Sequence, residues 1–240
     1  MRLRQTRTRA VILALLTASA LAACSGPDKA PDARTPTAAE QLAAAKAKAD
    51  AATSLHLTLR SSGIPASANG VLGADGSGTH APAFKGTLDA RIAGFSAKVE
   101  VVAIDRALYL KLPFTTEFVQ ADPKEYNAPD PAQLFATQGG ITSLITATTN
   151  PVEGKATRAG AEVLTTITGK LAGSSVKKLL NVGDATKTYD VTYGITDPGG
   201  ELRSVRVVGQ FFKSETSTAA TSTYLLTLDK YGAPVDISKP

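Results

Sequence analysis

The most chemically distinctive residue of the chain is Cys24, its only cysteine. Three small or aliphatic residues, Leu21 to Ala23, stand directly before it and end an uncharged run that begins at Ala10, after a start with four arginines. This order is typical of a bacterial lipobox, in which the cysteine thiol accepts a diacylglycerol before the signal is cleaved. The sequence therefore predicts lipidation of Cys24, with palmitate among the acyl chains. An ordinary signal peptide followed by an unmodified cysteine is the alternative.

The apolar run before Cys24 is too short to be a membrane span. It has 14 residues, whereas a helix that crosses a bilayer needs about 20. We expect residues 1–23 to be a lipoprotein signal peptide and the acyl chains on Cys24 to bind the membrane, at about 0.8 kcal/mol per buried methylene. Residues 24–37 contain three prolines and no large apolar residue, which predicts a stalk. The protein is then expected on the outer face of the cell membrane, in the cell envelope.

Imidazole chemistry has little material in this chain, because His56 and His80 are its only histidines. A Ser-His-Asp triad or a zinc site needs imidazoles at fixed positions, and the nucleophile-elbow and phosphate-loop motifs are absent from the sequence. We expect no catalytic residue, no metal and no cofactor, so the protein is predicted not to be an enzyme. Nucleic acid is not an expected partner either, because removal of the signal peptide lowers the net charge from +5 to +1.

Residues 38–240 contain no second linker and no fixed repeat, and we interpret them as one domain. Thr37 is placed to cap a helix from Ala38 to Thr53, with Glu40 completing a capping box. From Leu55 the apolar period changes from 3.6 to 2, which is typical of strands with one buried face. The alternating apolar positions are Leu55, Leu57 and Leu59; Leu88, Ala90 and Ile92; Phe95, Ala97, Val99 and Val101; and Leu108, Leu110 and Leu112.

Further strands and a few short helices are expected along the rest of the chain. The strands are predicted at 163–168, 189–196, 202–209 and 224–229, with a tight hairpin at Ala93-Gly94. The helices are predicted from Asp130-Pro131 to Phe135, from Ile141 to Thr148 before Asn150-Pro151, and after Ser174, with Val176, Leu179 and Leu180 on the apolar side. The polar run 216–223 is either a hairpin loop, the preferred interpretation, or an edge strand.

These elements predict an α+β fold, a curved antiparallel sheet of seven or more strands with short helices on its inner face. Aromatic residues make up only 5% of the chain, and many inward positions are Ala, Val or Gly. The inner face is therefore either underfilled, which leaves an apolar cavity, or closed by a core of small residues. Composition alone leaves both alternatives open.

Four segments resemble one family, the actinobacterial LppX/LprA/LprF/LprG lipoproteins. The lipobox is followed by Ser54-Leu55-His56, similar to an S-x-H at the start of that family's first strand. The segment Val101 to Leu110 is similar to its strand-turn-strand ending in LY, and Tyr126 to Ile145 resembles its two short helices. The end of the chain, Leu226 to Val235, resembles the family's T-L-S-x-W-G-x-x-V. The resemblance covers nearly the whole chain.

The resemblance implies a half-barrel of antiparallel strands whose concave face, covered by helices, encloses a cavity for multi-acylated lipids. The implied function is to bind triacylglycerol or glycolipid and carry it across the cell envelope, with an export transporter as a further partner. A non-lipid binding or scaffold lipoprotein with a filled core is the alternative. The expected lipid contacts are Leu88, Ala90, Ile92, Phe95, Ala97, Val99, Val101, Leu108, Leu110, Leu134, Ile141, Leu144 and Ile145.

Overall fold

The computed structural model describes residues 34–92, 94–126, 128–212 and 221–240. All helices and strands of this part of the chain belong to one compact unit, Pro36–Pro240. The predicted signal peptide, Cys24 and most of the predicted stalk lie outside the described residues, as does Ala93 of the expected hairpin turn. None of the described helices is long and apolar enough to cross a membrane.

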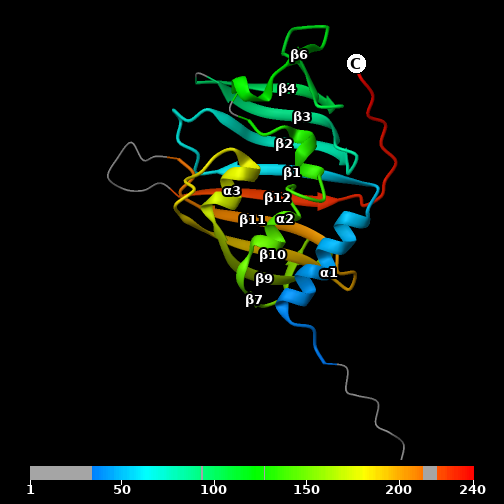
Figure 1. Ribbon diagram of the computed structural model, residues 1–240, viewed down its shortest axis with the longest axis vertical. Helices are drawn as coiled ribbons and strands as arrows, with labels where there is room; N and C mark the ends of the chain where they lie inside the picture. Colours follow the sequence, from blue (N-terminus) through cyan, green and yellow to red (C-terminus); the bar gives the residue numbers. More distant parts are fainter. Residues whose placement is uncertain (1–33, 93, 127, 213–220) are drawn as a thin grey trace, which may run out of the picture. The chain divides into compact units, whose positions relative to one another are not determined.

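The unit is built on one antiparallel sheet, ordered β6-β5-β4-β3-β2-β1-β12-β11-β10-β9-β7 with β8 paired to β9 (Figure 1). Strands β1 and β12 pair at its centre, with Leu57 opposite Leu228. The sheet and its few short helices confirm the α+β fold. The strands are β1 Ser54–Ser62, β2 Gly70–Thr79, β3 Ala83–Ile92, β4 Phe95–Ile104, β5 Ala107–Lys111, β6 Val119–Ala121, β7 Thr149–Glu153, β8 Thr157–Ala159, β9 Glu162–Ala172, β10 Thr188–Asp197, β11 Leu202–Gly209 and β12 Ser222–Asp229.

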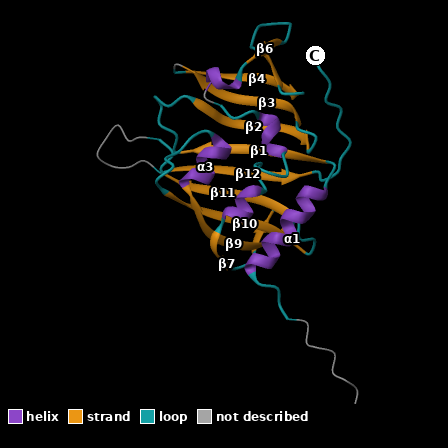
Figure 2. Ribbon diagram, in the orientation of Figure 1, coloured by secondary structure: helices purple, strands orange, loops and turns teal. Residues whose placement is uncertain are grey.

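The helices lie on one face of the sheet, which we call the inner face (Figure 2). Helix α1 (Ala38–Ala51) starts with the predicted capping box of Thr37 and Glu40. Its buried residues, Leu42, Ala45 and Ala49, are mostly small, so the helix lies close to the strands beneath it. The other helical elements are the 3₁₀ turns η1 Pro123–Tyr126 and η2 Pro131–Phe135 and the α-helices α2 Ser143–Ala147 and α3 Gly173–Leu180.

Strand β2 was not expected from the sequence, because its segment GVLGADGSGT contains four glycines and little apolar alternation. Glycine weakens a strand because it has no side chain to pack against its neighbours. It is nevertheless suited to places where another group approaches the backbone closely. A Cβ on Gly78 would lie 2.4 Å from the Phe135 ring, and one on Gly76 would lie 2.6 Å from the Phe84 ring. The two rings stack with centroids 5.8 Å apart. The glycines therefore make a shallow groove in the sheet that these two rings fill.

Several expected boundaries differ from the structure. Residues 131–135 form a 3₁₀ turn, although the Asp130 side chain caps it as expected by accepting from the amide of Ala132. Asn150 and Pro151 lie inside β7, where the left-handed φ of Asn150, +51°, accommodates the irregular pairing with β9. Helix α3 begins at Gly173 without a side-chain cap, so Ser174 lies within it. Of the run 216–223, Ser222 and Thr223 belong to β12, and 216–220 lies outside the described residues.

Buried tyrosines make the unit sensitive to alkaline pH. Burial raises the pKa of Tyr224 to about 12 and raises the pKa values of Tyr193 and Tyr231 well above their usual range. In the unfolded chain these phenols ionise near pH 10. Because the folded protein holds the protons more tightly, this contribution to stability is fully present below about pH 10 and is lost as the pH rises toward 12.

We therefore expect the urea midpoint of unfolding to fall between about pH 9 and about pH 11, and to fall less in Tyr193→Phe than in the wild type. The phenolate absorbance that Tyr193, Tyr224 and Tyr231 contribute should appear only as the chain unfolds. Full tyrosine ionisation in a protein that keeps its native circular dichroism would contradict this account.

Candidate functional site

Two neighbouring apolar pockets lie between the inner face of the sheet and the segment that carries η2. The first has a volume of about 50 Å³. Its floor is formed by strands β1, β2, β3 and β12, and its other walls come from η2, its preceding loop and the end of α3. It is lined by Leu57, Leu59, Gly70, Val71, Ala74, Leu88, Ala128, Pro129, Pro131, Leu134, Leu180, Val182, Tyr224 and Leu226.

The second pocket has a volume of about 70 Å³ and lies over the neighbouring strands β3, β4 and β5. It shares six lining residues with the first, among them Leu88 on β3 and Pro129 in the loop before η2. The two pockets are therefore adjoining parts of one apolar space, which the loop 128–131 narrows. The second is lined by Gly70, Val71, Leu88, Ala90, Arg91, Val99, Leu108, Leu110, Leu112, Pro123, Ala128, Pro129 and Pro131.

A larger hollow of about 650 Å³ lies elsewhere, between the turn at Asp105 and Arg106 and the C-terminal residues Val235 and Ile237. Its lining includes charged and polar side chains, such as Arg106 and Gln133. It is thus less suited to hydrocarbon than the two apolar pockets, although it is much larger. We refer to the two adjoining apolar pockets together as the candidate site.

The structure places six of the thirteen expected lipid contacts in the candidate site: Leu88, Ala90, Val99, Leu108, Leu110 and Leu134. Val101, Ile141, Leu144 and Ile145 lie in the hydrophobic core instead, and Ala97 is partly buried against that core. The side chain of Ile92 lies outside the described residues. Contact with a lipid remains a prediction for all of these positions.

Phe95 does not lie in the candidate site, because its side chain is 81% exposed. Leu112 and Val119 are also about half exposed, and Phe114 is fully exposed. Strand β5 pairs with β4, with Lys111 opposite Glu100, and β6 pairs Val119 with Leu110. Leu112 and Val119 therefore lie toward the β6 edge of the sheet, several residues away from Phe95 at the start of β4. Alternation assigned Phe95 and Leu112 to the inner face. Leu112 lines the second pocket although it is about half exposed, whereas Phe95 is left exposed.

Sequence reasoning missed several lining residues. Val71 lies in the unexpected strand β2, and Leu180 and Val182 lie at the end of α3. Tyr224 was placed in a strand but not in a site. Its neighbours Leu226 and Leu228 alternate with it in a period of two, and this pattern assigns all three to the buried face.

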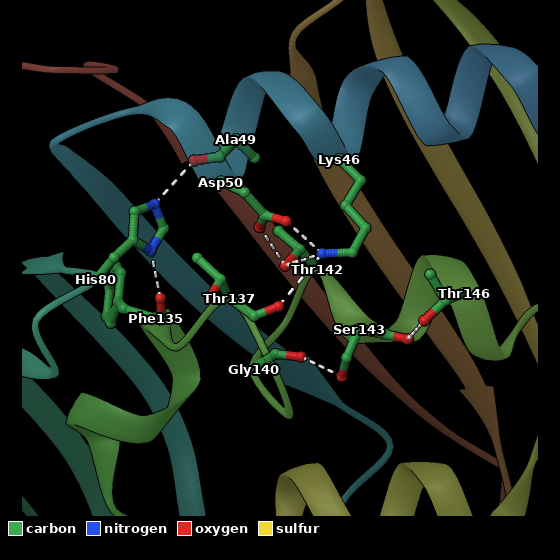
Figure 3. A network of polar contacts seen from close by, with 10 residues as sticks. All are labelled: Lys46, Ala49, Asp50, His80, Phe135, Thr137, Gly140, Thr142, Ser143 and Thr146. Atoms are coloured by element: carbon green, nitrogen blue, oxygen red, sulfur yellow. Dashed lines mark hydrogen bonds and ion pairs between the residues drawn. The ribbon is translucent and has the colours of Figure 1, made fainter.

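A polar network connects helix α1 to the chain segment that follows η2 (Figure 3). Lys46 of α1 forms an ion pair with Asp50 and donates to the carbonyl oxygen of Thr137, at 3.2 Å. The Thr142 hydroxyl donates to the Asp50 carboxylate at 2.7 Å. These contacts connect α1 to the chain between η2 and α2, so they hold the covering layer in place over the sheet.

His80, in the turn between β2 and β3, makes a second connection in this network (Figure 3). Its Nδ1 lies 2.5 Å from the Phe135 carbonyl oxygen, and its Nε2 lies 2.9 Å from the Ala49 carbonyl oxygen. Both ring nitrogens therefore lie within hydrogen-bond distance of a main-chain carbonyl oxygen, one in the last turn of α1 and one at the end of η2. His80 therefore acts as a cross-link between α1, η2 and the sheet.

We expect His80→Ala to lower the free energy of unfolding by about 2 kcal/mol, because the imidazole contacts with the carbonyl oxygens of Phe135 and Ala49 are lost. His56→Ala is the matched control. His56 contacts Asp229 and Asp75 on the opposite face, whose side chains are 44% and 64% exposed. Loss of His56 should therefore lower the free energy of unfolding by less than about 1 kcal/mol. Urea titration of both variants measures the difference. Equal losses would show that His80 is not a cross-link.

The site offers no constellation for covalent chemistry. Within the described residues, no group of three His, Cys, Asp or Glu side chains is arranged to hold a metal ion. The lining of the two pockets is apolar except for the side chains of Tyr224 and Arg91. What this arrangement can do is shelter hydrocarbon from water.

Comparison with known proteins identifies the family of this chain and its fold. The family model of the LppX_LprAFG lipoproteins matches residues 37–237. The chain therefore belongs to the LppX_LprAFG lipoprotein family, as the resemblance in the sequence had implied.

Two solved structures share the fold. LprF from Mycobacterium bovis is similar at a TM-score of 0.70 and 16% identity, over 85% of this chain and 96% of that one. LppX from Mycobacterium tuberculosis is similar at a TM-score of 0.61 and 20% identity, over 84% of this chain and 98% of that one. No curated protein matches the chain. Because the identities are low, this similarity concerns the fold alone. It confirms the predicted half-barrel, an antiparallel sheet with short helices on one face.

Proposed function

We propose that this protein binds a multi-acylated lipid, such as triacylglycerol or a glycolipid, in the candidate site and carries it across the cell envelope. The observation that supports this most is the continuous apolar lining of the two adjoining pockets on the inner face. Each methylene that leaves water for such a surface gains about 0.8 kcal/mol. A bilayer offers the same gain, so transfer between membrane and protein is nearly balanced, which suits a carrier that must also release its lipid.

The proposal requires the site to expand when a lipid is loaded. Pockets for ordinary small ligands measure about 300–1,000 Å³, whereas these two measure about 50 and 70 Å³. Ala128, Pro129 and Pro131 line both pockets, so moving this loop away from Leu88 merges them. Loading then consists of displacing the loop 128–131 and replacing its apolar contacts with acyl chains.

The location that we propose follows from the sequence of the first 37 residues. Residues 1–23 act as a signal peptide, Cys24 carries the acyl anchor, and residues 24–37 connect it to the domain. At about 3.1 Å per residue, a proline-rich stalk of this length spans roughly 40 Å. The domain then works on the outer side of the cell membrane, close to the bilayer that supplies its lipid, with an export transporter as its further partner.

The proposed function is tested by incubating the purified protein with vesicles that contain fluorescent triacylglycerol and a non-transferable lipid marker. Triacylglycerol should co-elute with the protein at a fixed stoichiometry and should move to acceptor vesicles faster than without protein. A protein that never acquires lipid would favour the alternative, an envelope scaffold with a filled core.

A further inference from the structure

We propose that the Tyr224 hydroxyl donates a hydrogen bond to a carbonyl oxygen of the bound lipid, so that the site selects ester- or amide-linked lipids over purely alkyl ones. This inference rests on the proposed lipid-binding function and adds a polar contact to it. The residue lies on β12, in the wall of the first pocket, and only 4% of its surface is exposed.

Tyr224 differs from the other buried tyrosines in having no hydrogen-bond partner for its hydroxyl among the described residues. The Tyr189 hydroxyl accepts from the amide of Asp184 and donates to the Gln210 carbonyl oxygen. The Tyr193 hydroxyl pairs with that of Thr148 at 2.6 Å, and the Tyr231 hydroxyl donates to the Leu202 carbonyl oxygen. The protein satisfies those three hydroxyls itself, whereas it leaves that of Tyr224 available.

The side chain of Tyr224 borders the free space of the first pocket. In the described part of the chain, every fully buried side-chain nitrogen or oxygen has a hydrogen-bond partner. An unpaired hydroxyl on a residue that is 4% exposed therefore keeps some accessible surface. Because the Tyr224 side chain lines the first pocket, the hydroxyl is inferred to face that pocket. Phe211 contacts the Tyr224 ring edge to face at 4.6 Å and fixes its orientation.

The apolar lining of the first pocket limits the groups that can accept a hydrogen bond from the Tyr224 hydroxyl. All other side chains that line the first pocket are apolar, so none of them supplies an acceptor, and none of the hydrogen bonds within the described residues engages this hydroxyl. Leaving a buried hydroxyl unpaired is unfavourable, and hydrocarbon cannot relieve it. The carbonyl that joins an acyl chain to glycerol is an acceptor within the apolar part of a lipid. Burial also raises the pKa of Tyr224 to about 12, so the phenol keeps its proton at physiological pH and remains a donor.

The test compares Tyr224→Phe with the wild type for two probes, dioleoylglycerol and the dialkyl ether analogue that lacks both carbonyls. Tyr224→Phe should bind the ester lipid about threefold to tenfold more weakly, the worth of one neutral hydrogen bond, and bind the ether lipid as the wild type does. Tyr193→Phe is the matched control. It removes a hydroxyl that already has a partner, Thr148, outside the site, so it should not discriminate between the probes.

Stability supplies a second readout that does not depend on lipid. Without lipid, Tyr224→Phe should keep or raise the urea midpoint of unfolding, whereas Tyr193→Phe should lower it. A loss in Tyr224→Phe as large as that in Tyr193→Phe would mean that the hydroxyl has a partner within the protein, and would overturn the inference.

The remaining outcomes separate the inference from the proposed function. In one of them, both probes bind the wild type while Tyr224→Phe lowers the affinity for neither probe, or for both equally. The Tyr224 hydroxyl then donates to a water molecule or to nothing, and not to the lipid carbonyl. Lipid binding then stands and the role of Tyr224 falls. If the wild type binds neither probe, both the proposed function and the inference are wrong.

Discussion

Replacing Leu88 with tryptophan is expected to reduce lipid uptake by more than tenfold while the protein stays folded. Leu88 lines both pockets at the point where they adjoin, so a larger ring there fills the space that acyl chains would occupy. An indole that excludes only two methylenes lowers the binding free energy by about 1.6 kcal/mol, which is more than tenfold in affinity. Because the ring enters existing free space, we expect the free energy of unfolding to change by less than about 1 kcal/mol.

The matched control for Leu88→Trp is Thr87→Trp, the same ring on the next residue of the same strand. Thr87 follows the alternation to the outer face, opposite Asp75 and Glu100 of the neighbouring strands. This variant should take up fluorescent triacylglycerol as the wild type does. Normal uptake by a folded Leu88→Trp protein would show that the candidate site is not where the lipid binds.

The second large effect is expected for Gly86→Ala, in the glycine groove of the sheet. A Cβ on Gly86 would lie 2.2 Å from the Asp75 carbonyl oxygen and 2.6 Å from the Gly76 Cα, and both are backbone atoms that cannot move aside alone. The methyl group would force β2 and β3 apart and displace the Phe84 ring that covers them. Overpacking of this kind costs about 3 kcal/mol, and urea titration should show a fall of that size.

Gly154→Ala is the control for this prediction. The nearest atom to a Cβ on Gly154 is the Thr166 carbonyl oxygen at 3.5 Å, an ordinary contact. Its free energy of unfolding should change by less than about 0.5 kcal/mol. If Gly86→Ala is as stable as Gly154→Ala, strands β2 and β3 do not approach each other as closely as the structure places them.

Sequence reasoning predicted the strands whose side chains alternate between apolar and polar residues. In β1, Leu55, Leu57 and Leu59 are buried as alternation requires. Strand β2 escaped the same reasoning because its inner positions Gly76 and Gly78 have no side chains. The groove they form is filled by Phe135, which lies 57 residues further along the chain. Local periodicity carries no information about such a distant partner, so a strand of this kind becomes visible only when the sheet is assembled.

The candidate site was predictable to a similar degree. Alternation identified Leu88, Val99 and Leu110 as inward residues, and all three line the site. It could not separate a side chain that borders free space from one that packs in the core, such as Val101, because both face inward. It also could not show that Phe95 is exposed, since this depends on which distant segments pack on the sheet. Nor could it show that Tyr224 lacks a partner, which depends on every neighbour of its hydroxyl.

The most direct test of the account is native mass spectrometry of a Cys24→Ser variant purified from a lipid-rich actinobacterial host. The substitution removes the acylation site, so any lipid that is found is bound without a covalent bond. We predict a complex of one protein with one di- or triacylated lipid, and solvent extraction should release that lipid for identification. A protein that is purified empty and also refuses added triacylglycerol and dioleoylglycerol would contradict the account and indicate a scaffold with a closed core.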